Sequence, residues 1–186
     1  MHRSISDLTK GLEYLLASPV SEGVVEMIAA RPREDQRDLL PTGKLDTELG
    51  LVGDNWKARG NRHTADGSAD PKAQLTLMNA RVVDLVAGDR QRWALAGDQL
   101  YVDLDLSKEN LPPGTRLQIG DAVIEVSDKP HTGCDKFASR FGAEALRFVN
   151  TGVGRDARFR GVNTFVVRSG EVNVGDSVVK LTDADL

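Results

Sequence analysis

Cysteine is nearly absent from this sequence. The 186 residues contain one cysteine, Cys134, so no disulfide can form within the chain and nothing indicates an oxidising compartment. The first residues, MHRSISDLTKG, contain no apolar segment typical of a secretory signal. No apolar run approaches the ~20 residues that a membrane-spanning helix needs. We therefore expect a cytoplasmic protein with no membrane partner.

A strongly basic composition is also absent. The chain has 24 Lys and Arg residues against 28 Asp and Glu residues, a net charge of −4 and a pI of about 5.4. General binders of the nucleic-acid backbone usually have a basic face or a high pI, so no nucleic-acid partner is expected. Basic residues do gather locally, and they indicate either solvated charge or an anion clamp: Lys57, Arg59, Arg62 and His63, and then Arg155, Arg158 and Arg160.

The hydrophobic pattern predicts a mainly β protein with short helices. Apolar residues at helical spacing predict an amphipathic helix over 4–17, which either packs on the rest of the chain or docks a partner, and we expect the first. The segment GVVEMIAARP and the segments QLTLM and QLYVDLDL predict strands. The polar residues 31–48 predict an exposed loop.

An internal similarity indicates how the strands are arranged. RLQIGDAVIEVS (116–127) aligns without gaps to EVNVGDSVVKLT (171–182), and a Gly-Asp pair falls at the same place in both. Glycine and aspartate favour tight turns, so each segment predicts a hairpin. Two equivalent hairpins in one short domain favour a closed or nearly closed barrel, which removes exposed strand edges.

Helical patterns flank these strands. Asn79 is placed to cap a short helix, NARVVDLVA. The segment 135–150 has phenylalanines and alanine at helical spacing, with a break expected near Gly142.

Cys134 lies where a basic loop meets this second helical pattern. Thiolate is the reactive form of cysteine, and a helix start or a nearby cation favours it. Lys129, His131 and Lys136 are close in sequence. A free cysteine is also often a buried, inert, small hydrophobic residue. From the residues alone both interpretations stay open.

Several segments, taken in order, resemble the MOSC family, the domain found at the C-terminus of molybdenum cofactor sulfurases and as small stand-alone bacterial proteins. The resemblance runs from Val24 to Leu181. Its landmarks are ELGLVGDNW, QLTLMNARVVDL, LPPGTRLQIGDAVIEVS, KPHTGC with Cys134, Arg160-Gly161 and SGEVNVGDSV. It implies an α+β fold with a MOSC-type β-barrel, residues 23–186 as the MOSC domain, and residues 1–22 as an N-terminal helical extension.

The resemblance also implies a cofactor and a site. Cys134 would be the family cysteine, which carries sulfur as a persulfide or contacts molybdenum, and molybdopterin would be the ligand. Residues at matching or adjacent positions would bind the cofactor: Asp54, Lys129, His131, Thr132, Lys136 and Arg160. Two departures from the family pattern are His131-Thr132-Gly133, where many members place proline before the cysteine, and Gly97-Asp98-Gln99, where Gly-Glu-Asn is frequent.

The resemblance also implies partners, because this chain is too short to contain the desulfurase domain of the fused enzymes. In the fused enzymes a pyridoxal-phosphate-dependent desulfurase domain supplies the sulfur, so no pyridoxal phosphate is expected on this chain. A separate cysteine desulfurase and a molybdoenzyme acceptor are the expected partners of a sulfur carrier. Two alternatives remain: a non-catalytic module that binds or delivers the cofactor, and a redox-sensing thiol protein.

Overall fold

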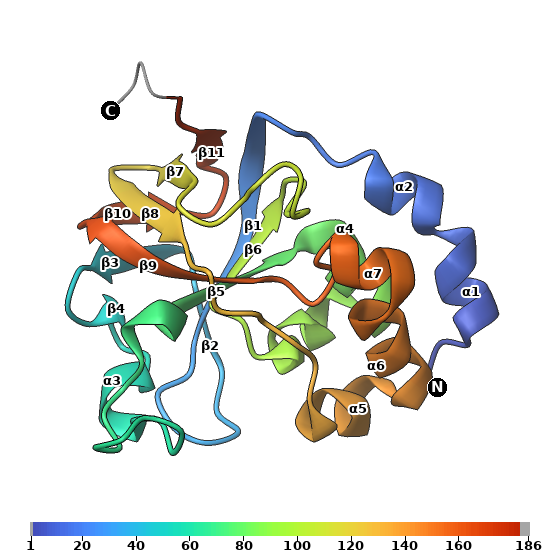
Figure 1. The fold of residues 1–186 in the computed structure, drawn as a ribbon, viewed down its shortest axis with the longest axis horizontal. Helices are drawn as coiled ribbons and strands as arrows, with labels where there is room; N and C mark the ends of the chain where they lie inside the picture. The colour runs from blue at the N-terminus through green and yellow to red at the C-terminus, as the bar shows by residue number, and fades with distance from the viewer. Residues whose placement is uncertain (1, 183–186) are drawn as a thin grey trace.

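The computed structural model describes residues 2–182 and shows a β-barrel beside a layer of helices. In Figure 1 the strands gather on one side, and helices α1, α2 and α4–α7 lie on the other. This is the mixed α and β architecture that the sequence predicts.

The barrel is closed, as expected. Within the described residues, seven strands form a ring in the order β1, β11, β7, β8, β9, β5, β6 and back to β1. All neighbours are antiparallel except β5 and β6. The strands are β1 (Glu22–Ala30), β5 (Leu75–Asn79), β6 (Leu100–Asp103), β7 (Arg116–Ile119), β8 (Ala122–Val126), β9 (Val162–Arg168) and β11 (Ser177–Lys180).

Only the first of the two expected hairpins forms. β7 and β8 pair across Gly120, which has a φ of 53°. The second prediction is wrong, because β10 (Gly170–Asn173) pairs with β3 (Thr42–Asp46) in a separate small sheet while β11 joins the barrel. The turn between them bonds to β1 instead: Gly175 N donates to the Val25 carbonyl at 2.8 Å, and Val25 N donates to the Asp176 carbonyl at 2.9 Å.

The expected exposed loop over 31–48 is also partly wrong. It contains β2 (Asp38–Leu40), which extends the barrel sheet beside β1, and β3, which pairs with β4 (Gly50–Leu51). Gly43 and Leu45 alternate with exposed residues along β3, so this short strand buries one face despite its polar composition.

The N-terminal helix packs on the domain but is divided in two. α1 (Ile5–Lys10) and α2 (Leu12–Leu16) meet at Gly11, where an added Cβ would lie 2.6 Å from a methyl carbon of Leu85. Leu8 and Leu15 are buried against the helical layer. The boundary after residue 22 stays a prediction, and residues 183–186 of the predicted domain lie outside the described residues.

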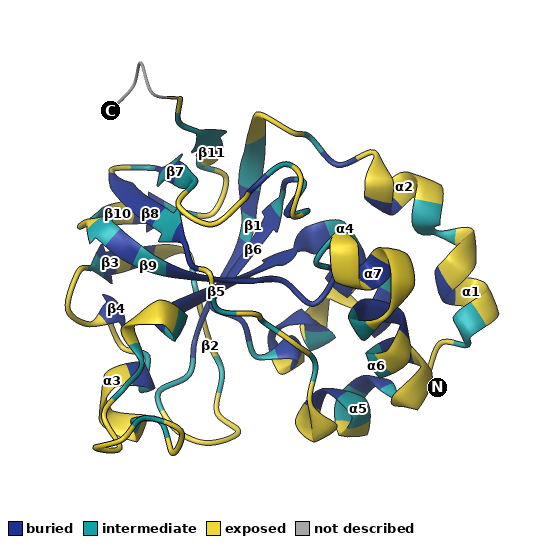
Figure 2. Cartoon of the chain, in the orientation of Figure 1, coloured by how far each residue is buried: buried dark blue, intermediate teal, exposed yellow. Residues whose placement is uncertain are grey.

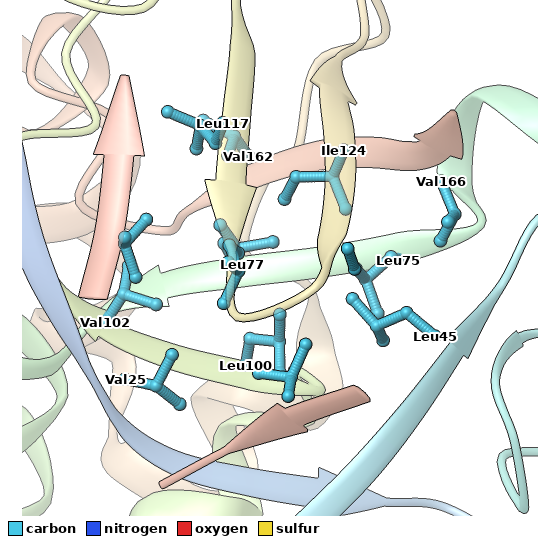
Figure 3. Close-up of a cluster of buried hydrophobic side chains, with 14 of the residues drawn as sticks. Val25, Leu45, Leu75, Leu77, Leu100, Val102, Leu117, Ile124, Val162 and Val166 are labelled. Atoms are coloured by element: carbon cyan, nitrogen blue, oxygen red, sulfur yellow. The ribbon is translucent and has the colours of Figure 1, made fainter. Parts of the chain in front are cut away.

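Two hydrophobic cores hold the molecule together. One fills the barrel, with Leu75, Leu77, Leu100 and Ile124 pointing inward (Figure 3). The other lies between the barrel and the helices, where dark buried segments line the inner side of the helical layer (Figure 2). Both expected helices are present in this layer: α4 (Ala80–Ala87) and the pair α5 (Asp135–Phe141) and α6 (Ala143–Asn150).

The local signals behind these helices are confirmed. The Asn79 side chain accepts hydrogen bonds from the first amides of α4, and Gly142, with a φ of 95°, separates α5 from α6. The remaining elements are α3 (Trp56–Arg59), α7 (Gly152–Asp156) and two 3-10 helices, η1 (Pro71–Ala73) and η2 (Arg90–Ala96). Within residues 2–182, no helix has the length and apolar character required to cross a membrane.

Candidate functional site

Cys134 is the residue immediately before α5, and it is exposed. The preceding Gly133 is held against α6, since its amide donates to Asn150 Oδ1 at 2.8 Å and its carbonyl accepts from Asn150 Nδ2 at 3.1 Å. On the other side, the Cys134 carbonyl accepts from Ala138 N at 3.0 Å. The backbone is therefore fixed while the thiol is accessible, and the interpretation of Cys134 as a buried spacer is wrong.

The thiol lies in the wall of a pocket of about 500 Å³, which we call the arginine pocket. The loop that follows β1, the start and end of α3, the end of η2 and the loop before α5 all contribute to it. Two carboxylates line it, Glu34 and Asp35. The cationic side chains that line it are Arg31, Arg33, Arg37, Arg59, Lys136 and Arg160. This local excess of positive charge contrasts with the net charge of −4 for the whole chain.

Among residues 2–182, three of these arginines have no carboxylate partner. Arg37 donates only to two backbone carbonyls, and Arg33 and Arg59 make no side-chain hydrogen bond or ion pair with any residue that the structure describes. Partial burial, and then repulsion from Arg140 and Arg31, lowers the pKa of Arg37. Partial burial and the nearby Arg31 likewise lower the pKa of Arg59. A bound anion would relieve this repulsion.

Arg31 is held differently, by a fully buried carboxylate. Its Nε donates to Asp54 Oδ2 at 2.8 Å and its Nη2 donates to Asp54 Oδ1 at 3.0 Å. The backbone amides of Arg31 and Trp56 also donate to Asp54, each at 2.9 Å. The expected cofactor residue Asp54 is thus shielded from the pocket by its own partners. It positions Arg31 and does not offer a free oxygen to a ligand.

A second buried carboxylate, Asp98, joins two predicted site residues. Arg160 Nη1 donates to Asp98 Oδ2 at 2.6 Å, and His131 Nε2 lies 2.9 Å from Asp98 Oδ1. Burial alone would raise the pKa of Asp98, but Arg160 and His131 outweigh it and lower the pKa to about 2. Burial and the adjacent Arg160 lower the pKa of His131, which favours its neutral form at neutral pH.

Arg160 is therefore not a wholly free phosphate clamp. Its Nη1 binds Asp98, its Nη2 donates to the Ala96 carbonyl at 3.0 Å, and its guanidinium lies 5.1 Å from the ring centroid of Phe137. Its buried Nε has no hydrogen-bond partner among the described residues.

The remaining predicted residues divide between two pockets. Lys136 lines the arginine pocket and forms an ion pair with Glu34 at 2.6 Å. Lys129 and Thr132 instead line a second pocket, and Lys129 is paired with Asp70. The structure therefore brings together Cys134, His131, Lys136 and Arg160 around one pocket, with Asp54 behind Arg31.

Sequence reasoning missed several residues that line this pocket, among them Arg31, Arg33, Arg37 and Asn55. The three arginines belong to RPREDQR, and the high charge of this segment by itself indicates a solvated loop. Only the folded barrel shows that this segment and Arg160 line the same pocket. Asn55 gave no signal, although its buried Oδ1 has no hydrogen-bond partner in the part of the chain that the structure describes.

The fold and the pocket define a closed-barrel protein with an exposed thiol beside clustered arginines. The MOSC domain model matches residues 60–179, and the chain belongs to this family. The match includes Cys134 and Arg160 but not residues 31–37. Membership is consistent with a role connected to the molybdenum cofactor. No curated protein matches the chain.

Solved structures with the same fold are distant in sequence. The YuaD protein from Bacillus subtilis is 16% identical, with a TM-score of 0.62 over 84% of this chain and 94% of that one. YiiM from Escherichia coli is 17% identical, with a TM-score of 0.56 over 87% of this chain and 70% of that one. YiiM from Geobacillus stearothermophilus is 15% identical, with a TM-score of 0.54 over 91% and 78%. At these identities the likeness shows the fold alone.

Proposed function

We propose that the arginine pocket binds the molybdenum cofactor and that Cys134 carries sulfur or contacts molybdenum there. The observation that supports this most strongly is one exposed thiol in the wall of a pocket lined by six cationic side chains and two carboxylates. An anionic ligand would be attracted to this pocket even though the chain as a whole is acidic.

The residues of the pocket fit the cofactor. Its volume of about 500 Å³ suits a small-molecule site. Arg33, Arg37 and Arg59 offer guanidinium forks to a phosphate, which arginine binds with matched geometry. Asn55 Oδ1 and Arg160 Nε, both without partners among the described residues, offer an acceptor and a donor to a polar ring system such as a pterin.

Cys134 supplies the chemistry of the site. When bound, the cofactor supplies molybdenum, for which a thiolate is a soft ligand. Sulfur loading needs no oxidant. The Cys134 thiolate attacks the outer sulfur of a donor persulfide, the donor S–S bond breaks with its electron pair leaving on the donor thiolate, and Cys134 keeps the outer sulfur as a persulfide.

The fate of that sulfur follows from the cysteine count. With no second cysteine, the persulfide cannot be resolved into an internal disulfide, so the sulfur must pass to an outside acceptor or stay. A cysteine desulfurase as donor and a molybdoenzyme as acceptor satisfy this requirement. A thioredoxin-like reductase does not.

Native mass spectrometry of the protein purified from cells that make molybdenum cofactor tests the binding step. We expect a bound pterin on the wild type and on Arg147→Gln, which changes an exposed arginine outside the pocket. Arg37→Gln removes the same charge from inside the pocket and should lose most of the pterin. Equal pterin on both variants would show that the ligand binds elsewhere.

Cys134→Ser separates the carrier from the alternatives. A sulfur carrier loses all loading while keeping pterin, because the arginines remain. A binding module delivers cofactor equally well with serine at this position. A redox sensor instead shows peroxide-dependent modification of Cys134 in protein that contains no pterin.

A further inference from the structure

A second pocket, of about 340 Å³, shares His131 and Arg160 with the arginine pocket as lining residues. We call it the Arg158 pocket. Cys134 does not line it. Pro130, Val149 and Val162 give it apolar walls, and Val149 and Val162 are buried in the two cores. An apolar pocket of this size that contains a few polar groups is typical of a small-molecule site.

Most of the charges around this pocket are already neutralised. Lys108 pairs with Asp156 at 2.9 Å, and the exposed Arg155 lies 3.8 Å from the same carboxylate. Lys129 pairs with Asp70. Arg160 pairs with Asp98 at 2.6 Å. The one carboxylate among its lining residues, Asp128, pairs with Lys72 at 2.8 Å.

Arg158 is the exception. It is half-buried, and Nη1 donates to the Leu111 carbonyl at 2.6 Å. Its guanidinium makes no other hydrogen bond, and no ion pair, with the residues that the structure describes. Burial lowers the pKa of Arg158, but an arginine stays charged at neutral pH. Among the described residues, the guanidinium of Arg158 is thus the one cation lining this pocket that has no carboxylate partner.

The backbone holds Arg158 in an uncommon conformation. Its φ is 50°, which is rare for a residue with a side chain. Two hydrogen bonds close the turn around it: Gly161 N donates to the Arg158 carbonyl at 2.7 Å, and Phe159 N donates to the Gly154 carbonyl at 2.8 Å. The next residue, Phe159, is anchored in the core, with its ring centroid 5.3 Å from that of Phe148. The position of Arg158 is thus fixed by its neighbours.

We propose that the Arg158 pocket binds a small organic monoanion, a carboxylate with an aromatic or branched aliphatic body. The free edge of the Arg158 guanidinium would pair with the carboxylate, and Val149, Val162 and Pro130 would contact the body. A half-buried guanidinium without a carboxylate partner among the described residues matches a ligand carboxylate, whereas apolar walls disfavour a strongly hydrated phosphate. The proposal does not depend on cofactor binding in the arginine pocket.

Such a ligand would lie next to the arginine pocket, because the two pockets have lining residues in common. His131 and Arg160 line both pockets, and Asp98 holds the two side chains together. The lining residues that the two pockets share therefore belong to a single hydrogen-bonded unit, which each ligand would contact.

Calorimetric titration of the full chain with benzoate, benzamide and inorganic phosphate tests this proposal. Benzoate should bind about tenfold more tightly than benzamide, its neutral isostere, since one charge-assisted interaction is lost. Arg158→Gln should weaken benzoate about tenfold, while Arg147→Gln, a matched loss of charge outside both pockets, should leave it unchanged. Equal affinity for benzoate and benzamide, or loss of benzoate binding in Arg37→Gln, would overturn the proposal.

A measurement on the wild type keeps the proposal testable if Arg158→Gln does not fold. Methyl resonances of Val149 and Val162 should shift on addition of benzoate, and that of Ala96, which lines only the arginine pocket, should not. Shifts confined to Ala96 would place benzoate in the arginine pocket and contradict the assignment. Displacement of benzoate by phosphate would contradict it as well.

Discussion

The arginine pocket has two sets of arginines that differ in what holds them. Arg31 and Arg160 are tied to the fully buried carboxylates Asp54 and Asp98. Arg33, Arg37 and Arg59 line the same pocket, and no carboxylate in the described part of the chain pairs with them. We call Arg31 and Arg160, with their two carboxylates, the fixed set, and we call Arg33, Arg37 and Arg59 the free set, which we propose binds the ligand. Stability and binding should therefore be separable by mutation within this one pocket.

The largest expected effect is a loss of unfolding free energy when a carboxylate of the fixed set is removed. Asp98→Ala leaves Arg160 buried without its counter-charge, and breaking a buried pair in this way costs about 3–5 kcal/mol of unfolding free energy. Asp156→Ala is the control, because its ion pair with Lys108 is exposed and should contribute under about 1 kcal/mol. Urea unfolding of both variants measures the difference. Similar small losses in both would mean that Arg160 does not depend on Asp98.

Mutation of an arginine of the free set should have a smaller effect, which lowers the affinity for the pterin and leaves stability unchanged. Arg37→Gln removes one charge-assisted contact and should weaken pterin binding by about 1.5–3 kcal/mol. The melting temperature should stay close to that of the wild type, because no carboxylate loses its partner. Fluorescence titration with the purified pterin, followed by a thermal melt, measures both quantities. A large drop in melting temperature would place Arg37 with the fixed set.

The acid dependence of stability should come partly from His131, which contacts the same carboxylate, Asp98, as Arg160 does. The folded state lowers the pKa of His131 below its ordinary 6.5, so the unfolded chain takes up that proton first. Stability is then lost as the pH falls through about 6.5, by at most ~1.4 kcal/mol per pH unit. His131→Asn should flatten this part of the profile. An unchanged slope in the variant would assign the pH dependence to another group.

Asp98 also makes the protein less stable as the pH falls, but over a lower pH range than His131. Its folded pKa of about 2 lies below the ordinary 3.8, so the stability that it contributes is present above about 3.8 and is lost as the pH falls towards 2. The Asp98→Ala variant should therefore lose less stability than the wild type over this interval. A parallel decline in the two proteins would contradict the lowered pKa of Asp98.

The sequence predicted the parts of the fold that local signals determine. Asn79 caps α4, Gly142 separates α5 from α6, and Gly120 turns the hairpin of β7 and β8, all as expected. Prediction from the sequence failed where a strand pairs with a segment that is distant in the sequence. The segment 171–182 repeats the turn of the first hairpin, but β10 pairs with β3, and pairing between such distant segments is not encoded in turn residues.

The candidate site likewise has one part that local sequence signals predict and one part that depends on the tertiary fold. Cys134 at the start of a helix follows from local pattern. The arginine pocket does not, because it exists only when barrel closure brings residues 31–37, Asn55 and Arg59 beside Arg160. A segment such as RPREDQR, with five charges in seven residues, indicates solvent exposure until its tertiary neighbours are known.

Sulfur loading of Cys134 tests the central claim most directly. The intact mass is measured before and after incubation with a cysteine desulfurase and free cysteine. We predict an addition of about 32 Da, one sulfur per chain, which cyanide or dithiothreitol removes and which Cys134→Ser does not take up. A wild-type protein that gains no mass, although its pterin is bound, would contradict sulfur carriage by Cys134.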